Sequence, residues 1–191
     1  ITVDGSGILH LEADSVHSSS GAADGTGAIN FAANSTATTS TGSITLIGAD
    51  FGIDSSATIS STSGGIAIAE SRTGRALAIG SASGFILSDT ELDRITTTSG
   101  TLTIGQAMTA GDNGAATTNV NTLTAAGVTT DGLTLSTDLA LVSSSTVTLG
   151  SGTLTGTLSV TSSGDITDTG TLAVTGTTTL AASTTGNITL D

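Results

Sequence analysis

Few residues in this 191-residue sequence could do chemistry, and they are widely spaced. The chain has two histidines, His10 and His17, and no third residue completes a metal-binding pattern with them. It has no cysteine, which excludes disulfides and thiolate metal sites. No serine has a histidine at a spacing that suits nucleophilic catalysis. We therefore predict no catalytic, metal-binding or cofactor-binding residues, and no cofactor.

Acidic residues are more numerous, and two pairs have a spacing of interest. Asp50 and Asp54 flank Gly52, and Asp165 and Asp168 lie three residues apart. Paired carboxylates hydrolyse glycosidic bonds, and they also bind calcium. β-Helical enzymes of that kind add aromatic residues that stack on sugar rings, whereas this chain has only three Phe and no Trp or Tyr. The Gly-rich pattern of calcium repeats is absent too, so we predict that the chain is not an enzyme and leave adventitious surface calcium open.

The charge of the chain excludes two classes of partner. Sixteen acidic residues against three arginines give a net charge of −13. A chain this acidic is repelled by phosphate backbones and by anionic lipid surfaces. No stretch approaches 18 consecutive apolar residues, which a transmembrane helix needs. We expect no nucleic-acid partner and no membrane insertion.

A short aliphatic-x-aliphatic triplet recurs along the whole chain. Thr, Val and Ile favour strands, and alternation places both aliphatic residues of a triplet on one face. Proline is absent, as expected for strands that are paired on both sides. The triplets are residues 9–11, 29–31, 44–46, 66–68, 77–79, 85–87, 102–104, 133–135, 139–141, 147–149, 158–160, 172–174 and 188–190.

The spacing of the triplets predicts an all-β fold, a parallel β-helix, because they recur at about one coil of such a fold. At about 4.8 Å between stacked strands, nine or ten rungs would make a rod about 45 Å long. We expect one domain over residues 1–191, a fragment of a longer chain, with loops at 12–26 and 105–120. The steps that carry this prediction are Leu9 to Ile29, Ile66 to Phe85 and Leu139 to Leu158, which are 20, 19 and 19 residues long.

One stretch breaks the triplet pattern. Ser88 and Glu91 form a capping box, in which the serine hydroxyl and the glutamate carboxylate each bond the backbone of the other residue. Leu92 and Ile95 lie three residues apart and therefore share one face of a helix. We predict a short helical turn near residues 89–95 that closes a corner of the coil.

The same region carries a resemblance to a known family. A strand over residues 85–87, a Ser/Asp-rich turn with Glu91, Leu92 and Ile95, and a Gly-x-Leu-x-Ile strand over 100–105 resemble the secreted exoproteins of the filamentous haemagglutinin type. The specific match covers about 20 residues. The rest of the chain shares with the family only the general pattern of short Gly-aliphatic-x-aliphatic strands. The resemblance implies a right-handed parallel β-helix, two-partner secretion and a location on the bacterial surface. The family's N-terminal secretion motifs are not found, and a monomeric autotransporter passenger has a similar pattern.

These observations lead to a functional expectation with an alternative. We expect a non-catalytic shaft segment of a large secreted adhesin that associates with itself or with neighbouring segments, and whose surface meets host or bacterial ligands. The alternative is a solenoid module that binds a glycan, a host protein or ice. Ice-binding solenoids display regular arrays of outward threonines, whereas the Thr-x-Thr pairs at 101–103, 146–148 and 153–155 recur at irregular steps.

Overall fold

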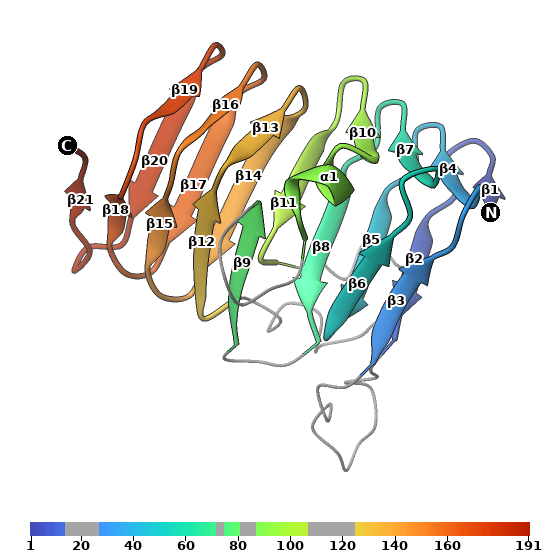
Figure 1. Cartoon of the computed structure of the whole chain (residues 1–191), viewed down its shortest axis with the longest axis horizontal. Helices are drawn as coiled ribbons and strands as arrows, with labels where there is room; N and C mark the ends of the chain where they lie inside the picture. The colour runs from blue at the N-terminus through green and yellow to red at the C-terminus, as the bar shows by residue number, and fades with distance from the viewer. Residues whose placement is uncertain (14–26, 72–74, 81–86, 107–124) are drawn as a thin grey trace.

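The structure is a computed structural model, and it describes residues 1–13, 27–71, 75–80, 87–106 and 125–191. Short strands stack in parallel, one coil upon another, from the N-terminus to the C-terminus (Figure 1). The predicted all-β parallel solenoid is therefore confirmed. In the described residues each coil contributes three strands in chain order, so that β1–β3 form the first coil and β19–β21 the last.

A central sheet runs through every coil. Its inward side chains form continuous columns, in one of which Ile44, Ile66 and Leu102 lie in direct register. The parallel pairing order is β2-β5-β8-β11-β14-β17-β20. The strands are β2 (Leu9–Glu12), β5 (Ile44–Gly48), β8 (Ile66–Glu70), β11 (Thr101–Ile104), β14 (Asp138–Ser143), β17 (Leu158–Ser162) and β20 (Thr178–Ala182).

Two flanking faces complete each coil, and each face is divided into two sheets. We call them the preceding face and the following face, after their place in the chain relative to the central strand. The preceding face consists of β1 (Thr2–Val3), β4 (Thr36–Thr39), β7 (Thr58–Ser61) and β10 (Ile95–Thr97), and then of β13 (Leu133–Leu135), β16 (Gly152–Leu154) and β19 (Leu172–Val174). The following face consists of β3 (Ala28–Phe31) and β6 (Asp50–Ile53), and then of β9 (Ala76–Gly80), β12 (Gly127–Asp131), β15 (Val147–Leu149), β18 (Ile166–Asp168) and β21 (Ile188–Thr189).

The described part of the chain has fewer coils than we predicted. The central sheet contains seven strands, not nine or ten. Six steps of about 4.8 Å span about 29 Å rather than about 45 Å. The late coils do have the predicted length, because Leu139 pairs with Leu158, 19 residues further on.

Three of the first four steps between coils are longer, and this explains the error in the count. Leu9 pairs with Ile44, 35 residues on, and not with Ile29. Ile66 pairs directly with Leu102, so Phe85 does not start a coil of the central sheet. The residues outside the described ranges all fall within such long steps, and they include most of the predicted loops at 12–26 and 105–120.

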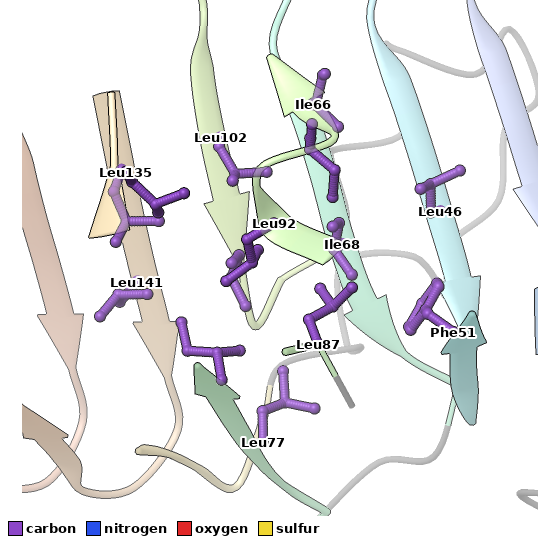
Figure 2. Close-up of a cluster of buried hydrophobic side chains, with 14 of the residues drawn as sticks. Leu46, Phe51, Ile66, Ile68, Leu77, Leu87, Leu92, Leu102, Leu135 and Leu141 are labelled. Atoms are coloured by element: carbon purple, nitrogen blue, oxygen red, sulfur yellow. The ribbon is translucent and has the colours of Figure 1, made fainter. Parts of the chain in front are cut away.

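The interior is a narrow cluster of aliphatic side chains with two phenylalanines, Phe31 and Phe51. Figure 2 shows Leu46, Ile68 and Leu141 of different coils pointing into it. Eleven of the thirteen predicted triplets lie wholly on strands of these coils, and a twelfth, 188–190, extends one residue beyond β21. Of the remaining triplet, Leu87 forms a parallel bridge with Ile79, and residues 85–86 lie outside the described ranges.

The predicted helical turn is present as α1 (Asp89–Leu92), and Ile95 already begins β10. The capping box forms, since Glu91 N–H donates to Ser88 Oγ at 3.3 Å and Ser88 N–H donates to Glu91 Oε2 at 2.9 Å. Leu92 is fully buried and projects into the interior (Figure 2). The turn thus closes the core, as predicted.

The corner between the preceding face and the central sheet is built from stacked glycines. A Cβ added to Gly64 would clash with the carbonyl oxygen of Gly42, and one added to Gly100 would clash with that of Gly64. Threonine hydroxyls at the ends of strands of the preceding face donate to the carbonyl groups of these glycines. Thr39 Oγ1 donates to the Gly42 carbonyl at 2.7 Å, and Thr97 Oγ1 donates to the Gly100 carbonyl at 2.6 Å. The close approach of successive backbones therefore requires glycine here.

We expect Gly64→Ala to lower the free energy of unfolding by about 1–3 kcal/mol, because the added methyl group forces two coils apart. Gly127→Ala is the matched control, since the nearest non-neighbouring atom to its Cβ is the Thr146 carbonyl oxygen at 3.5 Å. Denaturant unfolding followed by circular dichroism measures both. Equal losses for the two variants would contradict the stacked corner.

Candidate functional site

The histidines do not assemble a site in the described residues. His10 lies on β2 with its Nε2 atom 3.6 Å from Glu12 Oε2, and His17 lies outside the described ranges. Within the described ranges, no three His, Cys, Asp or Glu residues gather in a group that could hold a metal ion. The same part of the chain contains no helix long and apolar enough to cross a membrane.

Asp50, at the start of β6, and Asp54, in the turn after it, each bond a near neighbour in the sequence. Asp50 Oδ1 accepts the N–H of Phe51 at 3.0 Å. Asp54 Oδ1 accepts the N–H and the hydroxyl of Ser56 at 2.9 and 2.7 Å. These two bonds hold the pKa of Asp54 below its usual value; desolvation opposes them, and the charge of Arg94 adds a smaller lowering. The pair therefore shapes a turn and presents no shared site.

Asp165 and Asp168 serve a different purpose, which is to bond the next coil. Asp165 Oδ1 accepts the N–H of Asn187 at 2.8 Å, and Asp168 Oδ1 accepts the N–H of Asp191 at 3.0 Å. The two carboxylates thus reach two different backbone groups one coil away. A carboxylate that accepts a backbone N–H makes a charge-assisted hydrogen bond, which is stronger than a neutral one.

The same arrangement recurs at other corners. Asp131 Oδ1 accepts the N–H of Ser151 at 3.2 Å and its hydroxyl at 2.7 Å. Asp138 Oδ1 accepts the N–H of Thr157 at 2.7 Å. Sequence reasoning used the acidic residues to exclude classes of partner and left surface calcium open, and it missed this role. The available signal was the spacing, because each acceptor lies about one coil before its donor.

α1 carries two more of these carboxylates, at the place where both flanking faces are interrupted. The preceding face breaks between β10 and β13, and the following face between β6 and β9. Glu91 Oε1 accepts the N–H of Ile53, at the end of β6, at 3.1 Å. Asp89 Oδ1 accepts the N–H of Thr134, in β13, at 2.6 Å. The two side chains therefore act as hydrogen-bond acceptors for strands that end at the break.

An open cleft of about 460 Å³ lies beside α1. Glu91 contributes to its wall, but both of its carboxylate oxygens already accept hydrogen bonds from Ile53 and Ser88. The rest of the wall consists of hydroxyls, one guanidinium and the aliphatic side chain of Ile53, with no aromatic ring among them. The lining residues are Ile53, Ser55, Ser88, Thr90, Glu91 and Arg94. We assign this cleft to the α1 junction and not to a ligand.

An ion pair between the buried Glu70 and the partly exposed Arg75 holds a corner near the middle of the rod. The side chain of Glu70, at the end of β8, is 1% exposed. Arg75 Nη1 lies 3.2 Å from Glu70 Oε1 and donates to the carbonyl oxygen of Ala49, in the coil below, at 2.9 Å. A buried charge requires such partners, so this pair is a structural element that sequence reasoning also missed.

The predicted Thr-x-Thr pairs do not form one array. Thr101, Thr148 and Thr153, one from each pair, lie on β11, β15 and β16, which belong to three different sheets. The irregular steps between the pairs follow from this distribution.

A threonine column does run along the following face, and Thr148 of one of these pairs belongs to it. Thr148 and Thr167 lie in register, with their hydroxyl oxygens 3.4 Å apart. The column is one residue wide. The outward-facing position two residues before each threonine holds a different type of residue in each coil. Hydroxyl pairs between neighbouring strands stabilise a sheet, and this is the role we assign to the column. Its members are Thr129, Thr148, Thr167 and Thr189, and the earlier positions hold Gly127, Thr146, Asp165 and Asn187.

The comparisons with known proteins match only the last coils. Residues 136–191 are similar to a family described as repeats of unknown function, DUF5649. The matched part begins two residues before β14 and includes every strand from β14 to β21. No curated protein and no solved structure matches the chain. The matched residues are those in which the coils are shortest and most regular.

We expect Asp89→Ala to destabilise the α1 junction, because the Thr134 N–H loses its acceptor, at a cost of about 1–3 kcal/mol. Amide hydrogen exchange reports this locally as faster exchange at Thr134. Asp93→Ala is the control, since Asp93 is exposed on the same turn. Unchanged exchange at Thr134 in Asp89→Ala would rule out the carboxylate as its acceptor.

Proposed function

We propose that this chain is a non-catalytic shaft segment of a large secreted adhesin on the bacterial surface. The observation that carries the proposal is the central sheet, which runs without interruption through seven coils. A spacer has to resist bending, and a continuous parallel hydrogen-bond ladder over a continuous aliphatic interior provides that resistance.

The placement of the polar groups supports a structural role. Six carboxylates described above accept backbone N–H groups of other coils: Asp89, Glu91, Asp131, Asp138, Asp165 and Asp168. The outward hydroxyls form columns that bond along the rod, as Thr38 and Thr2 also do at 3.4 Å. These groups stabilise the stack of coils. Two of them, Glu91 and Asp168, also line hollows, but each already accepts a backbone N–H group.

The location rests on the resemblance to filamentous haemagglutinin-type exoproteins. The stretch that carries it, around Ser88 and Ile95, has the helical turn and the following strand that the resemblance implies. Absence of cysteine suits a chain that is exported unfolded, because no disulfide can obstruct its passage. We infer that binding to a host or bacterial surface belongs to other regions of the protein and that this segment holds those regions away from the cell.

A spacer should tolerate the loss of one whole coil. Deletion of residues 139–157 joins Asp138 to Leu158 and preserves the register of the central sheet. We expect this variant to stay folded and its rod to shorten by about 4.8 Å, as measured by small-angle scattering. Deletion of residues 139–148, about half a coil, is the control and should unfold the adjacent coils. If both deletions unfold the chain equally, the proposed modular shaft is wrong.

A shaft on the cell surface should be reachable from outside the cell. We expect an antibody raised against this chain to label intact cells of the source bacterium, and external protease to abolish the labelling. A cytoplasmic protein probed on the same cells controls for lysis. Labelling that appears only after the cells are permeabilised would contradict the proposed location, while leaving the fold and the spacer deletion unaffected.

A further inference from the structure

Most neighbouring coils of this rod are joined by three strand pairings, but two steps between coils have only two. We number the coils along the chain, so that β1–β3 form coil 1 and β19–β21 form coil 7. The central sheet crosses every step. Among the described strands, the following face has no pairing between β6 and β9, at the step from coil 2 to coil 3. The preceding face has none between β10 and β13, at the step from coil 4 to coil 5.

The two incomplete steps are not held equally well. On the following face, Leu87 forms a parallel bridge with Ile79 of β9, and Gly80 N–H donates to the Leu87 carbonyl at 2.9 Å. On the preceding face, no backbone hydrogen bond joins β10 to β13 in the described part of the chain. Asp89 of α1 bonds β13 there instead, with its Oδ1 atom 2.6 Å from the Thr134 nitrogen. The step from coil 4 to coil 5 therefore has the weaker backbone connection.

The corner residues mark the same step independently. Thr101 lies opposite Asp138 in the central sheet, and this register places Thr137 opposite Gly100. In earlier coils this corner position holds glycine, because a Cβ at Gly64 or Gly100 would clash with the carbonyl oxygen of the coil below. Thr137 is buried and has a Cβ. Coil 5 thus accommodates a side chain at the corner where the earlier coils have no room for one.

We propose that the rod has a joint between coils 4 and 5, which opens on the preceding face and is held closed by Asp89. The other two faces stay paired across this step, β11 with β14 and β12 with β15. These two ladders form the axis of the joint, because opening the preceding face breaks no backbone ladder. A region with few hydrogen bonds of its own opens more easily than its surroundings, and hinge motion between packed blocks requires only a few residues to change conformation.

This inference goes beyond the proposed spacer role, because it concerns how the rod bends and not what the rod carries. A shaft of identical coils bends equally at every step. A shaft with one weaker step bends there first and in one direction, since opening the preceding face tilts coils 5–7 toward the opposite side. The continuous central sheet keeps the two parts of the rod connected during this motion.

The test compares two pairs of spin labels that span the same coils on different faces. The chain has no cysteine of its own, so introduced cysteines are the only labelled positions. Thr96→Cys with Thr153→Cys spans coils 4 to 6 on the preceding face, and Thr129→Cys with Thr167→Cys spans coils 4 to 6 on the following face. All four positions alternate with inward-facing residues of their strands. Pulsed electron paramagnetic resonance measures the distribution of distances for each pair.

Asp89→Ala is the variant that should open the joint. We expect it to raise the ratio of longer to shorter distances on the preceding face about 10-fold, because the Thr134 N–H loses a charged acceptor. The following-face pair should keep a single narrow distribution. Asp89→Asn retains an oxygen that can accept this hydrogen bond and should restore most of the wild-type distribution. Asp93→Ala, an exposed change next to the same turn, should leave both pairs unchanged.

Circular dichroism confirms that each labelled variant is folded, and two results would then overturn the inference. Identical preceding-face distributions in the wild-type background and in Asp89→Ala would show that Asp89 does not hold this step closed. Equal broadening of both pairs in Asp89→Ala would show that the whole rod loosens and that no single step is a joint. Neither result affects the coil-deletion test, so the joint and the spacer role fail separately.

Discussion

Each coil of this rod has to bring its backbone to about 4.8 Å from the backbone of the coil below. In the central sheet this distance produces a parallel ladder of seven strands. At the corners it leaves no room for a side chain, as at Gly42 and Gly64. A proline would remove a donor from the ladder, and the chain contains none. A composition rich in Gly, Ser and Thr is therefore the consequence of stacking, although the same composition is typical of disordered linkers.

The stacking constraint also explains the position of α1. Both flanking faces change from one sheet to another near the middle of the rod, and each change leaves a strand edge without a strand partner. α1 occupies this place, and its carboxylates bond the strands on either side through Ile53 and Thr134. Leu92, from the same turn, fills the interior beneath the break. One turn of helix thus joins two solenoid arrangements while the central sheet passes through unchanged.

The sequence predicts those parts of the fold that local pattern determines. The capping box of Ser88 and Glu91 is local, and the helical turn was therefore found. Two strands of the preceding face, β4 and β7, were missed, because each has one buried aliphatic residue and a buried hydroxyl in place of the second. The coil count failed for a related reason: Leu9 to Ile29 is about one coil long, but pairing depends on the spatial neighbour, which is Ile44. The bonds of Asp165 and Asp168 depend on the next coil in the same way.

The distribution of polar groups has a consequence for how such a rod can grow. Carboxylates lie at corners where they bond the next coil, as Asp138 bonds Thr157, and hydroxyl columns bond along the faces. Neighbouring coils of the described rod are therefore joined in three ways, by the backbone ladder, by carboxylates at the corners and by hydroxyls on the faces. Lengthening such a shaft by one coil repeats all three kinds of bond.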